Sequence, residues 1–200
     1  MSLRHAILGF LSVRPMSGYD LKRTFDQSVR HFWSADQAAI YRMLSELEAD
    51  GLVAHERIAQ ETRPDRKLFH ATASGLSALD EWLTASAPAV PRREPLLVKL
   101  FFSGRLTSDE VQGLLRDELD AVNAEMSAFK TYVAGMGARA ESADAERRAV
   151  MIGPLVTLTN GVRLGVAYRA WLQGLLRESS AGTLTAERLL NELRAALDAE

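Results

Sequence analysis

The spacing of apolar residues changes twice within the first 85 positions, and this change restricts the fold more than any other feature. Up to about residue 50 the apolar residues recur every three or four positions, as in amphipathic helices. Residues 52–60 and 66–71 are rich in β-branched and aromatic positions and flank the turn-forming segment 61–65. Helical spacing returns from residue 73 to 85. The pattern therefore predicts three helices, a two-stranded hairpin and a fourth helix.

Polar residues indicate where several helices begin. In a capping box, a Ser or Thr accepts a hydrogen bond from the amide three positions later, and the side chain there bonds back. Three pairs follow this pattern: Ser17 with Asp20, Ser34 with Gln37, and Thr107 with Glu110. We expect helices to start at each of them. Gly51 stands where the third helix would end in a left-handed residue.

Pro88 and Pro91 mark a linker over residues 87–95, because proline lacks an amide donor and disfavours helix before it. We expect one domain over residues 1–86 and a second, helical domain over residues 96–200. A long helix should begin at Thr107 and stop near Gly135 and Gly137. A second stretch, 143–176, should be interrupted or kinked at its Gly-Pro pair.

The second half of that stretch is apolar on two sides, so two partner surfaces must cover it. We interpret one of them as the interface of a homodimer. The residues predicted for this interface are Leu158, Val162, Gly165, Tyr168, Trp171, Leu172 and Leu176.

Composition excludes several classes of function. The chain has no cysteine, and its four histidines lack the spacing of metal ligands, so we expect no metal, no cofactor and no catalytic site. No uninterrupted apolar run approaches the roughly 18 residues of a membrane span, and no secretory signal is visible, which predicts a cytoplasmic protein. The net charge of -2 says little about nucleic acid, because an average hides where the cations lie.

The third helix has the composition of a recognition helix. If Ile40, Leu44 and Leu47 face the core, the opposite side carries small and donor-bearing residues that suit the major groove of DNA. Its amino-terminal amides could also bind a phosphate. The residues predicted to bind DNA on and before this helix are Ser34, Ala35, Gln37, Ala38, Tyr41, Arg42 and Ser45.

The hairpin adds cations that could lie along the DNA backbone as a wing. The residues predicted to bind phosphates there are Arg57, Arg63, Arg66 and Lys67. Together, the three helices, the hairpin and the linking helix predict a winged helix-turn-helix domain, followed by an α-helical dimerisation domain.

Several motifs in register resemble the PadR family of transcriptional regulators. They are Ala6 to Leu11, Ser17 to Leu21, Ile40 to Leu44 with Leu47 and Glu48, Gly51 to Val53, and Arg66 to Phe69 with Thr72 and Gly75. Residues 94–102 are similar to the helical domain of the virulence-regulator-like branch. The resemblance implies homodimers, repression at inverted repeats and, in some members, release by small aromatic effectors. Where the family usually has two tyrosines, this chain has Leu68 and Phe69.

Plainer interpretations compete with each of these assignments. The exposed side of the third helix could be ordinary solvated surface, and the hairpin cations could only protect an edge strand. His31 and Trp33 could line an effector pocket or fill a gap between the domains. Tyr168 and Trp171, with Arg169 nearby, could form a ligand cage or belong to a core. As a whole, the chain could be a small-molecule-binding or protein-interaction module without specific DNA binding; an enzyme is the least favoured class.

Overall fold

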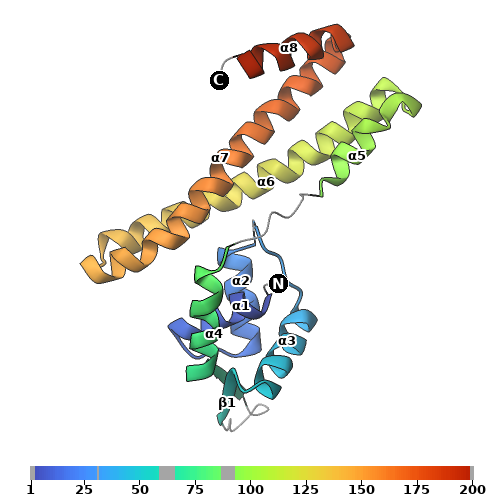
Figure 1. Cartoon of the computed structure of the whole chain (residues 1–200). Coiled ribbons are helices and arrows are strands. Elements are labelled where there is room, and N and C mark those ends of the chain that lie inside the picture. Colours follow the sequence, from blue (N-terminus) through green and yellow to red (C-terminus); the bar gives the residue numbers. More distant parts are fainter. Residues whose placement is uncertain (1–2, 31, 59–65, 87–92, 199–200) are drawn as a thin grey trace. The chain divides into compact units, whose positions relative to one another are not determined.

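The computed structural model describes residues 3–30, 32–58, 66–86 and 93–198. The chain divides into two compact units, Met1–Val90 and Pro91–Glu200. The fold is mainly helical with one small hairpin, as the sequence predicts (Figure 1).

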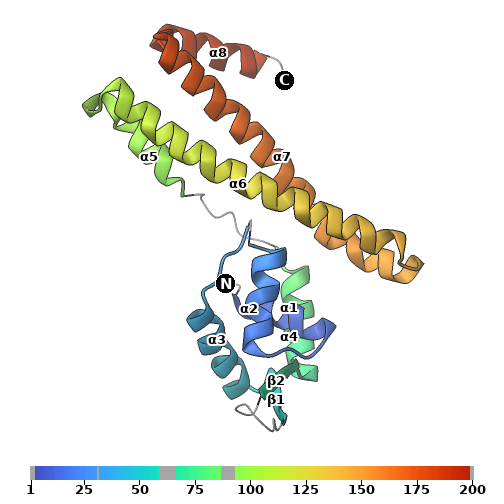
Figure 2. The ribbon, with the colours of Figure 1, turned by 180° about the vertical axis from the view of Figure 1, so that it is seen from behind.

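The first unit contains the helices and strands in the predicted order. The elements are α1 (Leu3–Val13), α2 (Gly18–Ser28), α3 (Gln37–Ala49), β1 (Val53–Ile58), β2 (Arg66–Ala71) and α4 (Ala73–Thr84). Apolar side chains from all of them form one core, in which Leu8, Leu21 and Ile40 are fully buried. Figure 2 shows the unit from behind, with the hairpin at its lower end, below α2 and α3. Two residues after α3 ends, Gly51 has a φ of 69°, the left-handed conformation that favours glycine.

Strands β1 and β2 pair antiparallel, with Val53 opposite Ala71 at one end and Ile58 opposite Arg66 at the other. Before α2, Met16 and Phe69 exchange two backbone hydrogen bonds, of 3.0 and 2.9 Å, which attach β2 to the start of that helix. The predicted hairpin is therefore present, and its connecting segment lies outside the described residues.

Two expected helix starts are confirmed and one is wrong. Ser17 and Thr107 form the predicted capping boxes with Asp20 and Glu110. Helix α3, however, is capped by Asp36, whose carboxylate accepts from the Ala39 amide at 2.7 Å. Ser34 is only two residues upstream, and the carboxylate takes the position that we expected for its hydroxyl.

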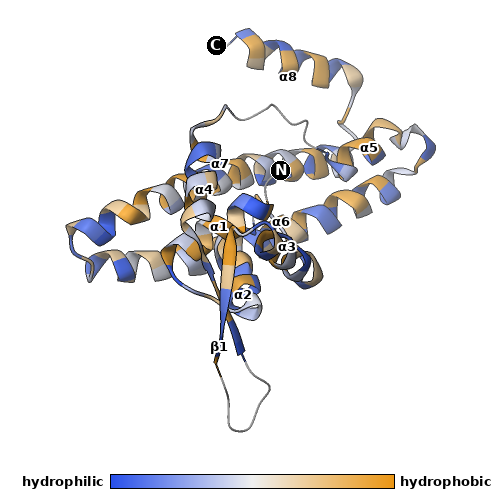
Figure 3. Ribbon diagram, turned by 60° about the horizontal axis from the view of Figure 1, so that its bottom comes forward, coloured by the Kyte–Doolittle hydropathy of each residue, from blue (hydrophilic) through white to orange (hydrophobic). Residues whose placement is uncertain are grey.

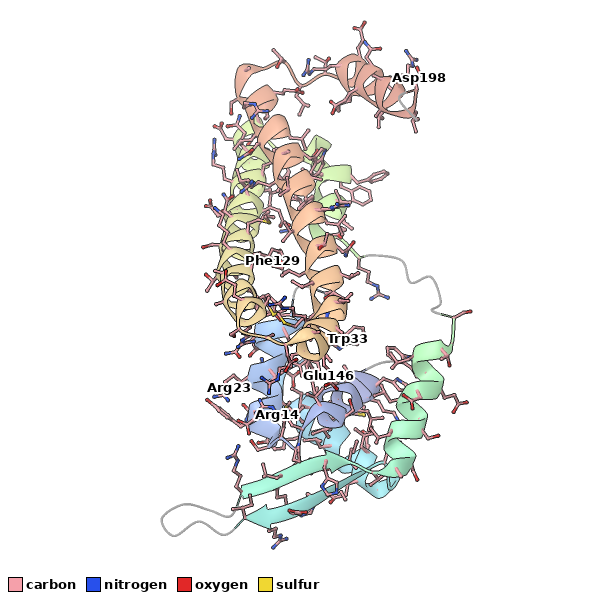
Figure 4. All side chains as sticks on the ribbon, turned by 90° about the vertical axis from the view of Figure 1, so that its left-hand side faces the viewer. Arg14, Arg23, Trp33, Phe129, Glu146 and Asp198 are labelled. Carbon is pink, nitrogen blue, oxygen red and sulfur yellow. The ribbon has the colours of Figure 1, made fainter. Side chains whose placement is uncertain are left out.

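The second unit consists of α5 (Pro95–Phe101), a 3-10 turn (Ser103–Arg105), α6 (Ser108–Glu141), α7 (Ala145–Ala181) and α8 (Ala186–Asp198). Helices α6 and α7 form a long helical hairpin around an apolar core, and Phe129, labelled in Figure 4, is buried in it. The predicted stop near Gly135 and Gly137 is wrong, because α6 runs through both. The predicted interruption at Gly153 and Pro154 is also wrong, because α7 is one continuous helix with Pro154 inside it; a kink there stays a prediction.

Candidate nucleic-acid interface

Helix α3 presents the predicted strip to solvent. Its core side is closed by Ile40, Leu44 and Leu47, all buried. The opposite side is exposed at Gln37, Ala38, Tyr41, Arg42 and Ser45, and Ser34 is exposed just before the helix. Ala35 differs, because it is half-buried and packs against the core of the first unit.

The donors on this strip are unequally available. The Ser45 hydroxyl donates to the Tyr41 carbonyl at 3.1 Å, so its proton is already used within the helix. Arg42 has no ion-pair partner among the described residues. It is therefore the one long cationic donor of the strip that is ready for a base edge or a phosphate.

Tyr41 is held in place by the helix before it. A Cβ atom added to Gly18 would lie 2.5 Å from the Tyr41 ring, so the glycine at the start of α2 permits the ring to pack there. The ring nevertheless remains 44% exposed. Its position on the strip is thus set by the packing of α2 against α3.

The amino terminus of α3 is less suited to a phosphate than we expected. The Asp36 carboxylate already accepts the hydrogen bond of the Ala39 amide, and it adds a negative charge at this end of the helix. A carboxylate at that position interacts favourably with the helix dipole but repels a second anion.

Two of the acidic residues near the strip have side-chain partners. Glu48 of α3 lies against the imidazole Nδ1 of His55 on β1, and Arg4 of α1 pairs with Asp50 at 2.7 Å. Glu46 is exposed, and no such partner is found for it among the described residues. The His55 contact also joins the hairpin to α3, which the sequence analysis did not anticipate.

The register divides the hairpin cations between two faces. Arg57 lies directly opposite Lys67, so both side chains are on one face, whereas Arg66 is opposite Ile58 on the other. Like charges directly opposite each other destabilise a strand pair, so the Arg57 and Lys67 pair would be stabilised by a bound anion. Figure 3 shows hydrophilic residues along the outer part of the strands. Arg63, also predicted to bind phosphate, lies outside the described residues.

Arg66 forms an ion pair with Asp20 of α2. Burial raises the pKa of Asp20, but hydrogen bonds from the Ser17 hydroxyl, from Arg66 and from the Ser17 amide outweigh it. The pKa of Asp20 therefore lies below its usual value of 3.8. Sequence reasoning gave Asp20 only a capping role, although strict alternation along β2 already places Arg66 and Lys67 on opposite faces.

The aromatic residues considered as ligand contacts have other neighbours. Trp33 packs against the core of the first unit, and His31 lies outside the described residues. Tyr168 of α7 donates to Glu118 of α6 at 3.2 Å and stacks on Trp171. Burial, followed by the charge of Glu118 and this hydrogen bond, raises the pKa of Tyr168 to about 12.

Most residues predicted for the dimer interface pack within the chain. Leu158 and Leu172 are buried in the core that α6 and α7 share, and Val162, Tyr168 and Leu176 pack against it. A Cβ atom on Gly165 would lie 2.6 Å from the sulfur of Met126 on α6, so this glycine serves the contact between the two helices. Trp171 is 37% exposed and is thus accessible from outside the subunit.

Comparison with known proteins identifies both units. Residues 7–81 match the transcriptional regulator PadR-like family, and residues 92–179 match the virulence activator alpha C-terminal family. The negative transcriptional regulator PadR of Bacillus subtilis is 28% identical over 176 residues, which cover 87% of this chain and 95% of that protein.

Solved structures agree with these matches. A crystal structure of B. subtilis PadR with operator DNA superposes with a TM-score of 0.77 at 26% identity, covering 90% of this chain and 98% of that one. The same protein in complex with p-coumaric acid gives 0.69 at 27% identity, with coverage of 89% and 95%. The Vibrio cholerae virulence activator AphA gives 0.69 at 25% identity, with coverage of 90% and 99%.

Proposed function

Because the chain is a transcriptional regulator of the PadR-like family, whose members are not enzymes, we propose that it is a cytoplasmic repressor that binds an inverted-repeat operator as a homodimer. The observation that carries this proposal is the exposed strip on α3, where Arg42 has no ion-pair partner among the described residues. The relative that superposes at a TM-score of 0.77 was solved with operator DNA, which supports DNA binding by this chain.

In this proposal α3 enters the major groove and the hairpin follows the backbone. Arg42 and Tyr41 would reach base edges or phosphates, while Ala38 allows the helix to approach closely. Arg57 and Lys67, on one face of the hairpin, would contact phosphates, and each contact would release counterions. The domain limits 1–86 and 96–200 assign DNA binding to the first unit and dimerisation to the second.

The dimer proposal relies on the apolar surface that α7 and α8 leave uncovered. Ile152, Val156, Leu164 and Val166 of α7 are 42–62% exposed, and α8 exposes Leu193 at 60%. By length and composition alone α7 could span a membrane, and only 6% of its most apolar window is buried within the chain. A second copy of the chain would cover this surface and account for the apolar composition of α7.

A groove between α7 and α8 offers a further surface of this kind. It has a volume of about 970 Å³ and is lined by Trp171 and Leu175 of α7 and by Leu189 and Leu193 of α8. Trp171, predicted for the interface, would contribute to it. We propose that a helix of the second copy enters this groove.

We also propose that a small aromatic molecule releases the repressor, as suggested by the structure of the B. subtilis relative with p-coumaric acid. A rotation between protomers would change the spacing of the two α3 helices, which for successive major grooves is about 34 Å. A ligand that favours one arrangement by a few kcal/mol would be sufficient.

The test is binding to the DNA upstream of the chain's own gene, compared with a scrambled duplex, at two salt concentrations. We expect preference for the upstream DNA, and we expect Arg42→Ala to reduce that preference by about 1–3 kcal/mol if Arg42 makes a bidentate base contact. Lys67→Ala is the control, because loss of a phosphate contact should weaken both duplexes alike and reduce the salt slope by about 0.9. Equal, salt-independent binding to both duplexes would favour the alternative, a ligand-binding or protein-interaction module on a winged-helix scaffold.

A further inference from the structure

Asp20 forms more hydrogen bonds and ion pairs than its role as a capping residue requires. Its Oδ2 atom accepts from the Ser17 hydroxyl at 2.7 Å and from the Ser17 amide at 3.3 Å, and the same oxygen pairs with Nη2 of Arg66. Its Oδ1 atom lies 3.5 Å from Arg23, which extends from α2 (Figure 4). The Asp20 side chain is only 16% exposed. One carboxylate thus joins the start of α2 to the outer end of β2.

This ion pair is the second point at which the hairpin is attached to α2. The first is the pair of backbone hydrogen bonds between Met16 and Phe69, near the base of β2. Arg66 is three residues farther toward the tip. A two-stranded hairpin is at best marginally stable alone, and one attachment near its base leaves the outer part free to swing. A second attachment farther out fixes its direction.

The face on which Arg66 lies agrees with a role other than phosphate binding. Arg57 and Lys67 share one face of the hairpin, while Arg66 belongs to the other and already has a carboxylate partner. To bind a phosphate through Nη2, Arg66 would have to give up this carboxylate partner.

We infer that Arg66 is a positioning residue, which acts through Asp20 to hold the wing at a fixed angle to α2 and so places Arg57 and Lys67 on the DNA backbone. The inference rests on the proposed DNA-binding function. It assigns to Arg66 a role that differs from the phosphate contact expected from the sequence.

The direction in which Asp20→Asn changes the affinity for DNA separates the two roles. If Arg66 binds phosphate and Asp20 only competes for it, Asp20→Asn removes a negative charge near the DNA and should strengthen binding. If Asp20 positions the wing, the same substitution should weaken binding. Asparagine keeps a side-chain oxygen that can still accept from Ser17, so the cap of α2 is largely retained.

The first measurement needs no DNA. Amide hydrogen exchange of residues 66–71 is followed in the full-length wild type, in Arg66→Ala, in Asp20→Asn and in the double variant. We expect both single variants to speed exchange in β2, and the double variant to add nothing, because either change removes the same ion pair. Lys67→Ala, the adjacent cation on the other face, is the control and should not speed exchange, because it removes only the repulsion between Lys67 and Arg57.

The second measurement is the affinity for a mixed-sequence duplex over a range of salt concentrations. We expect Arg66→Ala and Asp20→Asn to weaken binding by a similar factor, about twofold to fivefold, as suits a partly exposed ion pair. The double variant should be no weaker than either single one. Asp26→Asn is the charge control, since Asp26 also lies on α2 but pairs with Lys22, and it should not weaken binding.

The outcomes are distinct. Tighter binding by Asp20→Asn, additive losses in the double variant, or unchanged exchange in both single variants would each overturn the inference. If the wild type binds no duplex at all, the proposed function fails and the DNA-related half of the inference fails with it. The exchange rates still decide in that case whether the ion pair holds the wing.

Discussion

At the scale of single residues, the strip on α3 depends on a glycine in the helix before it. Gly18 is buried, and the Tyr41 ring occupies the space where a Cβ atom would lie, with its Cε1 atom 2.5 Å from that position. Helix propensity alone would favour alanine over glycine inside a helix by about 1 kcal/mol. Here the close approach outweighs propensity.

We therefore expect Gly18→Ala to lower the free energy of unfolding by about 1–3 kcal/mol, because the added methyl group must displace the Tyr41 ring. Urea denaturation followed by circular dichroism measures this change. Gly9→Ala is the matched control: Gly9 lies in α1 with nothing within 4 Å of its Cβ position, so alanine should stabilise the protein by about 0.5–1 kcal/mol. In a Tyr41→Ala background the cost of Gly18→Ala should disappear, and an undiminished cost would contradict the assigned contact.

At the scale of elements, the sequence predicts best where local chemistry and packing agree. The capping boxes at Ser17 and Thr107 lie where helical periodicity also begins, and both are present. At Ser34 the pattern was equally good locally, but Asp36 caps the helix instead. A four-residue motif cannot decide between two acceptors that are two residues apart.

The long helices show the opposite case, in which packing overrides local preference. Gly135 and Gly137 are exposed, while Met136 between them is buried, so α6 continues because its apolar side is covered. Pro154 removes the helical partner of the Val150 carbonyl, but Val150 is 69% exposed, and water can hydrogen-bond there. Whether a helix tolerates such glycines and prolines depends on its tertiary environment, and local sequence preference carries no information about that environment.

Of the candidate site, the sequence predicted the exposed side of α3 but not the contacts that organise the hairpin. Helical periodicity is sufficient to place Arg42 and Tyr41 on the side opposite Ile40. The pairing of Arg66 with Asp20, by contrast, joins residues 46 positions apart. Only the folded arrangement of α2 and β2 brings them together.

Helices α6 and α7 are joined by a polar contact that alkaline titration can detect. Tyr168 bonds to Glu118, and its pKa is raised from 10.0 to about 12. The stability from keeping this hydroxyl protonated is fully present below pH 10 and is lost as the pH rises toward 12. We expect the difference in phenolate absorbance between the wild type and Tyr168→Phe to appear only near pH 12. A difference with its midpoint near pH 10, while circular dichroism still reports folded protein, would contradict the assignment.

At the scale of the whole molecule, the proposed dimer should depend on the face of α7 that points away from α6. Val156 lies on this face and is 62% exposed, so Val156→Arg should convert the dimer to a monomer while the helical content stays unchanged. Sedimentation velocity measures the mass. The control is Ala128→Arg, at an exposed position of α6, which should remain dimeric. A monomeric wild type would exclude the dimer.

The two facing cations of the hairpin also affect how the protein behaves during purification. Arg57 and Lys67 repel each other until an anion lies between them, although the chain as a whole carries a net charge of -2. Despite its acidic isoelectric point, the protein should be retained on heparin or phosphocellulose and should carry nucleic acid fragments from the lysate. A wash at high ionic strength should remove both kinds of bound polyanion, because screening weakens such contacts.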